Sequence, residues 1–348
     1  MHRTMLKVSI CLLLMSAIIY ACGEYTRTIN EINKYKKLEK DTEGLLVLQA
    51  EKKVDLSSEP ERKKAPQEIF NFQDQSFLKI KGLTPPSDRK VKAGLMVELN
   101  SQKILWGKNV LEPVAIASLT KVLTVLVAME QVDNNDQVNY DTKIPITSTA
   151  RSVPSSSFLR KHPHKEVPIR ELLQSAMVKS ANDSCQLLAE YIGGGESSRF
   201  IAMMNAKARQ LKMKSSAFYN PHGLPGKYFT PQTPDNTSSM EDLMLLVMEV
   251  WEKRKEVFKW TSKKSFKLPS NHSRGVIINN TNPLVSMNGV IGLKTGYTNN
   301  AGWCLITVYK SSSRVFFSIV TGCPTKPERN SFCRSLLLWG IKAAKTFD

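Results

Sequence analysis

The hydrophobic pattern with the clearest structural meaning lies between Pro113 and Met129, where the chain reads PVAIASLTKVLTVLVAM. This run has no glycine and no proline after its first residue, so it predicts a mostly buried helix that begins near Ser118. Lys121 is the only charged residue in the run. A serine and a lysine three positions apart lie on one helical face, and the two side chains are therefore expected to meet.

The chemistry of this pair depends on where the amine of Lys121 lies. Burial disfavours the ammonium form, so a buried Lys121 is partly neutral at about pH 7 and is a candidate base for the hydroxyl of Ser118. The alternative is a lysine whose aliphatic stem is buried while its ammonium group reaches water. The Ser-x-x-Lys pattern does not decide between them, because it also occurs at Ser76 and Ser87 in a charged region with few apolar residues.

Four short apolar segments predict two β-hairpins, because each pair flanks a polar turn. They are residues 93–99 with 103–106, and residues 301–308 with 314–320. Lys294 is expected on the strand before the second hairpin. A helical middle from Ile169 to Ser262 separates the hairpins, and a closing helix is predicted from about Asn330. The pattern predicts an α+β fold in which helices flank an antiparallel sheet, with a helical subdomain and the candidate site between the two parts.

Two further motifs follow the Ser118 pair along the chain. Ser180-Ala-Asn182 comes after the predicted helix Ile169–Val178, and Lys294-Thr-Gly296 closes the segment that begins at Gly289. The order Ser-x-x-Lys, Ser-x-Asn, Lys-Thr-Gly is the motif set of β-lactamases and penicillin-binding proteins. From about Val91 to Phe347 the chain resembles the serine-type D-Ala-D-Ala carboxypeptidases, the low-molecular-mass penicillin-binding proteins. Further matching segments are Phe218–Leu224, Gly292–Thr298, Ala301–Trp303 and Leu336–Gly340.

The resemblance implies a β-lactamase/transpeptidase-like fold and an acyl-enzyme mechanism without a cofactor. It implies that Ser118 attacks the carbonyl of the penultimate D-Ala of a peptidoglycan stem peptide while Lys121 takes its proton. Ser180 then relays a proton to the leaving amine. Peptidoglycan stem peptides are the expected substrates, and β-lactam antibiotics are the expected covalent inhibitors.

The same resemblance assigns the substrate-binding residues. Asn182 holds the substrate amide and aligns Lys121, and Lys294 supplies a second cation that lowers the pKa of Lys121. The backbone N–H groups of Ser118 and Tyr297 match the oxyanion-hole positions. Thr295, next to Gly296 in the third motif, and Arg329 are expected to bind the terminal carboxylate.

The assignment of Arg329 rests on counting back without gaps from the segment Leu336–Gly340. Lys326 and Arg334 are the nearby substitutes if that count is wrong, and Arg329 is then a solvated surface residue. His222, in Asn-Pro-His-Gly, is interpreted as a turn residue and takes no part in the predicted mechanism.

Three other functions stay open from the residues alone. A murein DD-endopeptidase uses the same nucleophile on cross-linked stems. A β-lactamase needs a glutamate in a loop after the middle motif, whereas Glu166 and Glu171 precede Ser180. A non-catalytic binding lipoprotein keeps the fold alone, and it is disfavoured because every catalytic position is occupied by the matching residue.

The first residues predict export. Arg3 and Lys7 precede an apolar stretch, Val8–Ala21, that is short for a membrane span, and residues 1–21 are therefore predicted to be a signal peptide. Ile19-Tyr-Ala-Cys22 resembles a lipoprotein box with Cys22 as the lipidation site; the alternatives are ordinary cleavage after Ala21 and an uncleaved anchor. Residues 22–90 are predicted to be a charged spacer and residues 91–348 the catalytic domain. The expected location is periplasmic, or the outer face of a bacterial membrane, through an N-terminal lipid anchor.

The catalytic segment is strongly basic. Residues 92–348 contain 33 Lys and Arg against 19 Asp and Glu, a net charge of +14. An anionic partner is one interpretation, and solubility with a general preference for lysine is the other. Nucleic acid is not expected as a partner, because the chain is predicted to be exported and no helix combines clustered arginines with aromatic residues.

Four cysteines remain outside the predicted signal peptide and Cys22: Cys185, Cys304, Cys323 and Cys333. Their spacing matches no metal-binding pattern, so no metal site is predicted. Export permits disulfides, but a core of this size does not need them, and buried free thiols are favoured.

Overall fold

The computed structural model describes residues 69–346 except 74–76, 156–157, 161, 163 and 269–275. The predicted signal peptide, the predicted lipidation site Cys22 and the first part of the spacer lie outside the described residues. In the described part of the chain, none of the helices is both long and apolar enough to cross a bilayer.

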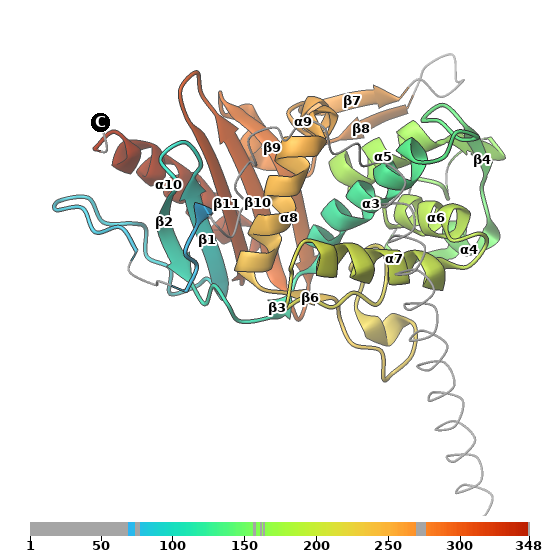
Figure 1. Cartoon of the computed structure of the whole chain (residues 1–348), viewed down its shortest axis with the longest axis horizontal. Helices are drawn as coiled ribbons and strands as arrows, with labels where there is room; N and C mark the ends of the chain where they lie inside the picture. Colours follow the sequence, from blue (N-terminus) through green and yellow to red (C-terminus); the bar gives the residue numbers. More distant parts are fainter. Residues whose placement is uncertain are drawn as a thin grey trace, which may run out of the picture. The chain divides into compact units, whose positions relative to one another are not determined.

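The main sheet has five antiparallel strands in the order β2-β1-β11-β10-β9 (Figure 1). Their bounds are β1 Ala93–Glu98, β2 Lys103–Lys108, β9 Val290–Thr298, β10 Gly302–Lys310 and β11 Val315–Cys323. Both predicted hairpins are confirmed, since β1 pairs with β2 and β10 pairs with β11. Lys294 lies on β9, as predicted, and β9 is the edge strand that borders the helical part of the domain.

The helices are α4 Ser148–Ser152, α5 Ile169–Val178, α6 Asn182–Ile192, α7 Ser197–Gln210, α8 Met240–Lys253, α9 Lys255–Thr261 and α10 Lys326–Ala344, and α3 Lys121–Asp133 continues the 3₁₀ turn η1 Ala117–Thr120. The remaining short elements are β3 Val114–Ala115, β4 Lys143–Pro145, β5 Glu166–Pro168, β6 Thr237–Ser238, β7 Ser265–Leu268, β8 Val276–Asn279, η2 Gly226–Tyr228 and η3 Pro283–Ser286. The predicted helix Ile169–Val178 is confirmed as α5.

The sheet separates two hydrophobic cores, because successive side chains of a strand point to opposite faces. On β1, Leu95 and Val97 join the larger core with α3 and α8, whereas Met96 joins the smaller core under α10. The larger core continues into the helical part, where α3 packs against α5, α6, α7 and α8. Every residue of α3 from Lys121 to Met129 is buried, which is the all-round burial that the apolar run predicted.

The closing helix begins earlier than predicted, at Lys326 instead of about Asn330. The hydroxyl of Thr325 accepts a hydrogen bond from the backbone N–H of Glu328, and the Thr325 hydroxyl also donates to the Glu328 carboxylate. Thr325 is therefore the N-cap of α10 in a Thr-x-x-Glu sequence, with Pro327 in the first turn. The Thr-x-x-Glu signal is visible in the sequence, and following it would have placed the start correctly.

The packed domain also extends beyond its predicted start at residue 91. Phe70 and Phe72 are buried in the larger core, and the indole N–H of Trp339 donates to the carbonyl of Leu83. Residues 69–90 were included in the charged spacer because their apolar positions are few and show no period. Phe77, Leu78, Ile80 and Leu83 are partly buried and pack against the two cores, so this part of the spacer belongs to the domain.

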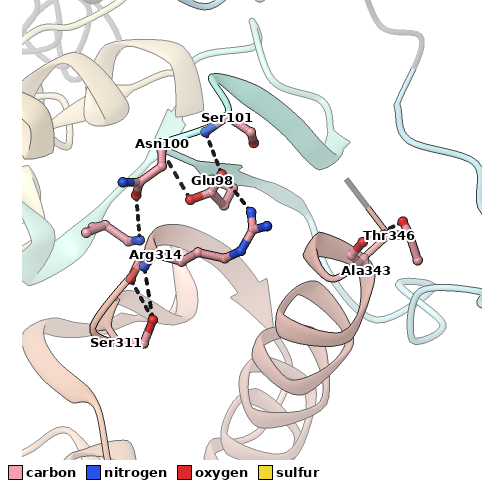
Figure 2. A network of polar contacts seen from close by, with 8 residues as sticks. Glu98, Asn100, Ser101, Ser311, Arg314, Ala343 and Thr346 are labelled. Carbon is pink, nitrogen blue, oxygen red and sulfur yellow. Dashed lines mark hydrogen bonds and ion pairs between the residues drawn. The ribbon is translucent and has the colours of Figure 1, made fainter. Parts of the chain in front are cut away.

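A buried carboxylate ties together the two hairpin turns at one end of the sheet (Figure 2). Glu98 accepts hydrogen bonds from the backbone N–H groups of Asn100 and Ser101, and its second oxygen lies 3.5 Å from the guanidinium of Arg314. The side chain of Asn100 accepts from the backbone N–H of Val315. These contacts fix the ends of β1 and β11 relative to each other, and the sheet that carries β9 is built on that frame.

Candidate active site

Ser118 lies in the 3₁₀ turn directly before α3, and its hydroxyl faces the first residue of that helix. The distance between the Ser118 Oγ and the Lys121 Nζ is 2.8 Å. Ala117, just before Ser118, has a φ of +47°, a conformation that residues other than glycine adopt at a cost. The chain therefore turns sharply before the serine, and the half-buried hydroxyl is held against the lysine as predicted.

The amine of Lys121 is completely buried and surrounded by oxygen atoms. Besides Ser118, its Nζ lies 2.7 Å from Asn182 Oδ1 and 2.5 Å from the backbone carbonyl oxygen of His222. Burial lowers the pKa of Lys121 from its ordinary value to about 8. The alternative of an ammonium group that reaches water is therefore excluded.

This arrangement suits a neutral amine that accepts a proton from Ser118. A neutral lysine has two N–H bonds and one lone pair. The Asn182 Oδ1 and the His222 carbonyl act only as acceptors, so they take the two N–H bonds and leave the lone pair for the Ser118 hydroxyl. The Asn182 side-chain NH₂ donates to the carbonyl oxygens of Pro154 and Ser155, which fixes the direction of its own oxygen.

The contact between the Lys121 amine and His222 was not predicted, because it is made by the backbone carbonyl of His222 and not by its imidazole. The loop reaches η1 through Gly223, which has a φ of +78°. A Cβ at this glycine would lie 1.9 Å from the carbonyl oxygen of Ala117, so only glycine allows the approach. Burial holds the pKa of the His222 imidazole well below its usual range, and the neutral ring accepts a hydrogen bond from the Leu224 N–H. The sequence signal was the glycine after His222.

The third motif forms the opposite wall of the site on β9. A Cβ at Gly296 would lie 3.1 Å from the backbone nitrogen of Ser118 and 3.3 Å from the Cβ of Ala117. The absence of a side chain at Gly296 therefore lets the strand lie against the turn that carries the nucleophile. Thr295 is buried beside it, whereas the side chain of Tyr297 is half exposed and stacks on Trp303 at 4.3 Å between ring centroids.

Lys294 is buried as deeply as Lys121, and its Nζ donates to the carbonyl oxygen of Thr295 at 2.9 Å. Burial is the main cause that holds the pKa of Lys294 well below its ordinary range, and the nearby Lys121 lowers it further. Lys294 was predicted to act as a second cation for Lys121. Burial is also the main cause of the lowered pKa of Lys121, so the role of Lys294 as a second cation stays a prediction.

Thr281 is a further residue of the site that the motifs did not reveal. Its hydroxyl lies 2.6 Å from the hydroxyl of Thr295, and its backbone N–H donates to the carbonyl of Val178, the last residue of α5. Thr281 thus links β9 to the helix that precedes the middle motif. It lies in a polar loop without periodicity, and nothing in the sequence alone marks it.

Ser180 occupies the turn between α5 and α6 with a φ of +63° and is half-buried. It lies two residues before Asn182, which reaches the amine of Lys121. Within the described residues the Ser180 hydroxyl makes no hydrogen bond, so its predicted role as a proton relay stays a prediction.

Arg329 is buried in the first turn of α10, with only 1% of its surface exposed. Its guanidinium donates to the carbonyl oxygen of Cys304 and to the side-chain oxygen of Asn330. Cys304 is paired with Gly296 across β10 and β9, which places Arg329 one strand from the third motif. Among the described residues no carboxylate pairs with this guanidinium. The substitutes considered from the sequence, Lys326 and Arg334, are both exposed.

The cysteines are free buried thiols, as predicted: Cys185, Cys304, Cys323 and Cys333. Burial raises the pKa of the Cys185 thiol to about 11 and that of Cys304 to about 12. These thiols are therefore protonated and unreactive at neutral pH.

Comparisons with known proteins agree with this geometry. The family described as D-alanyl-D-alanine carboxypeptidase matches residues 80–325. D-alanyl-D-alanine carboxypeptidase DacF of Bacillus subtilis is 31% identical over 282 residues, which cover 80% of this chain and 69% of that protein. A D-alanyl-D-alanine endopeptidase of Pseudomonas aeruginosa is 27% identical over 226 residues, which cover 64% of this chain and 68% of that protein.

Among solved structures, penicillin-binding protein D2 of Listeria monocytogenes in its cefotaxime-bound form has a TM-score of 0.65 and 26% identity. The match covers 74% of this chain and 100% of that one. This likeness confirms the predicted α+β fold. The chain spans about two thirds of the length of the curated relatives that it matches.

The titration of Lys121 predicts the pH dependence of acylation. Because only the neutral amine accepts the proton of Ser118, the acylation rate should fall about tenfold per pH unit below the pKa of about 8 and level off above it. The burst of product from a chromogenic thioester, followed across this range, measures the rate. Lys121→Arg has no accessible neutral form and should not be acylated at any pH. An inflection near the ordinary lysine value of 10.5 would contradict the role of burial.

Proposed function

The chain belongs to the D-alanyl-D-alanine carboxypeptidase family, and from this premise we propose that it removes the terminal D-Ala from peptidoglycan pentapeptide stems. The reaction is a serine-type hydrolysis through an acyl-enzyme on Ser118. The observation that carries the proposal is the 2.8 Å contact between the Ser118 hydroxyl and a buried amine whose other neighbours are fixed acceptors.

In the acylation step the Ser118 oxygen attacks the carbonyl carbon of the penultimate D-Ala while its proton passes to Lys121. The negative charge that develops on the carbonyl oxygen is stabilised by the backbone N–H groups of Ser118 and Tyr297, and a donor of this kind contributes roughly 3 kcal/mol. The C–N bond then breaks, and the free D-Ala leaves with a proton that Ser180 relays to its amine. Water hydrolyses the ester on Ser118, and the serine recovers its proton.

The charge distribution supports a substrate that ends in a carboxylate. Arg329 is a buried guanidinium that pairs with no carboxylate among the described residues, and such a group favours an incoming anion. The Thr295 hydroxyl lies on the neighbouring strand and supplies a second donor to the same carboxylate.

The endopeptidase is the second candidate, and the resemblance to the Pseudomonas aeruginosa protein favours it. It uses the same nucleophile and acyl intermediate but releases a D-amino acid that belongs to a neighbouring stem. A β-lactamase is disfavoured, because it needs a glutamate in a Glu-x-x-Leu-Asn loop after the middle motif. Glu166 and Glu171 lie before that motif, and no such sequence follows Asn182. A binding protein without activity would have no use for the Ser118–Lys121 contact.

β-Lactam antibiotics are the inhibitors that this mechanism implies. The Listeria monocytogenes protein has been solved in its cefotaxime-bound form, and this chain shares its fold. Opening of the lactam ring by Ser118 would form the same ester as the substrate does. The leaving nitrogen stays attached, so hydrolysis of the ester is slow and the protein is inactivated.

The cellular location is part of the proposal. Residues 1–21 act as a signal peptide, and Cys22 becomes the acylated first residue of the mature protein, which then lies in the periplasm or on the outer face of the membrane. The charged n-region and the short apolar stretch Val8–Ala21 support export, and Ile19-Tyr-Ala-Cys22 supports lipidation.

The reaction is tested with the purified chain and its Ser118→Ala variant on a mixture of murein peptides, with products followed by mass spectrometry. The carboxypeptidase predicts the loss of one alanine from pentapeptides, absent in the variant. Conversion of cross-linked dimers to monomers would establish the endopeptidase instead. Rapid turnover of penicillin without murein products would make the protein a β-lactamase.

The carboxylate contact is tested by Arg329→Gln, with the exposed Arg334→Gln on the same helix as its control. Loss of the guanidinium should lower kcat/KM about 100-fold for a peptide that ends in a free carboxylate, and the control should leave it unchanged. With a peptide that ends in an amide, wild type and Arg329→Gln should differ little. An equal loss on both peptides would mean that Arg329 serves only to hold the fold.

Lipidation is tested by Cys22→Ser in a bacterial host. The wild-type chain should incorporate a labelled fatty acid and fractionate with membranes, and the variant should do neither at the wild-type level. Labelling that survives in Cys22→Ser would place the modification elsewhere, and a chain that keeps residues 1–21 would contradict the signal peptide.

A further inference from the structure

The positive charge of the domain is concentrated in one short segment. Residues 253–267 contain seven Lys and Arg and one acidic residue, Glu256, a net charge of +6. This segment of fifteen residues therefore supplies close to half of the +14 carried by residues 92–348. A general preference for lysine would spread the charge evenly, so the cluster needs its own explanation.

The segment comprises α9 and β7, and the end of α9 lies beside the base of the β7–β8 hairpin (Figure 1). We call the exposed lysines of this region the basic face: Lys259, Lys263, Lys264, Lys267 and Lys310. Lys310 lies at the end of β10, and its Nζ is 5.9 Å from the indole centroid of Trp251. In the described part of the chain none of these five lysines forms an ion pair, so their charges are available to a partner.

Apolar side chains lie among these charges. Ile277 on β8 is 63% exposed and sits opposite Lys267 on the outward side of the hairpin, whereas the neighbouring pair of Phe266 and Ile278 points into the core. The Nζ of Lys255 lies 4.0 Å from the ring centroid of Trp251, which bridges it to Lys310. A surface of lysines with an exposed aliphatic residue matches the boundary between lipid head groups and acyl chains.

The basic face is connected to the active site. The residues that follow β8 include Thr281, whose hydroxyl meets that of Thr295 in the third motif. The side chain of Asn280 donates to the carbonyl oxygens of Thr261 and Lys263, which ties the base of the hairpin to α9. If a partner binds this hairpin, the strand β9, which carries the third motif, therefore lies at a fixed distance from that partner.

From these observations we propose that the basic face binds the surface of a bilayer that contains anionic phospholipids. This rests on the proposed export of the chain but not on the proposed reaction. A soluble phosphodiester polymer would satisfy the lysines but would leave Ile277 without an apolar partner. A basic surface is the kind of second signal that stabilises attachment through a lipid anchor on Cys22.

The test measures partitioning of the full chain onto vesicles in a Cys22→Ser background, so that no acyl chain masks the effect. The variant combines Lys259→Gln, Lys264→Gln and Lys267→Gln. The matched control combines Lys165→Gln, Lys212→Gln and Lys342→Gln, which removes the same charge from exposed positions elsewhere. Vesicles of phosphatidylcholine alone are compared with vesicles that also contain phosphatidylglycerol.

Each lysine at an anionic surface contributes about 1 kcal/mol, or about a fivefold change in binding, so the three substitutions should lower partitioning onto the anionic vesicles about 100-fold. The control should change it less than about threefold, and high salt should remove the difference. Ile277→Ser should also weaken binding to these vesicles. Acylation of Ser118 by a β-lactam should be the same in both triple variants, which keeps this test separate from that of the reaction.

Equal partitioning of the two triple variants would overturn the proposal. So would a loss of binding to soluble poly(glycerol phosphate) in the Lys259, Lys264 and Lys267 variant without any loss on vesicles, because the partner would then be a polymer and not a membrane.

Discussion

The burial of one amine governs the design of this domain. The Nζ of Lys121 lies where water cannot reach it, so its hydrogen bonds must all come from the protein. Three oxygens from separate parts of the chain meet this need, and one of them is the hydroxyl that the amine activates. An unsatisfied amine at this depth would cost several kcal/mol, and the surrounding loops are therefore constrained to bring their oxygens to it. Gly223 and Gly296 are needed because each allows backbone to approach the turn that carries Ser118.

The second constraint on the site is the set of ionisable groups around Ser118. Two buried lysines and one buried arginine lie around the nucleophile, and among the described residues Arg329 has no carboxylate to balance it. A buried guanidinium without a carboxylate partner is unfavourable, and under the proposed function the terminal carboxylate of the substrate would supply that partner. The donors that would bind the carboxylate under this proposal are already held in place, so binding would need little reorganisation.

The sequence predicted those parts of the structure that depend on local patterns. The hairpins and α5 have clear periods and turn residues, and the apolar run predicted a buried helix around Lys121 while leaving the burial of the amine itself open. The start of α10 was predicted too late, although the Thr325 cap was visible in the sequence. Phe70 and Phe72 were assigned to the spacer, because two apolar residues without a period do not indicate that a segment belongs to a packed domain. The His222 carbonyl and Thr281 were missed for a different reason. A backbone oxygen has no side-chain signature, and Gly223 was only an indirect signal for it. A loop threonine acquires its role only when the chain brings it to Thr295.

The oxygens around Lys121 and the strand that faces them come from four segments, which begin at Ser118, Asn182, His222 and Lys294. None of these segments is adjacent to another in the chain, so the site has a high contact order: loops of many tens of residues must close before its atoms meet. No fragment or partly folded intermediate can hold the amine, the hydroxyl and their acceptors together. Ser118 is consequently not activated as a nucleophile until folding is complete, and its reactivity therefore reports the native state.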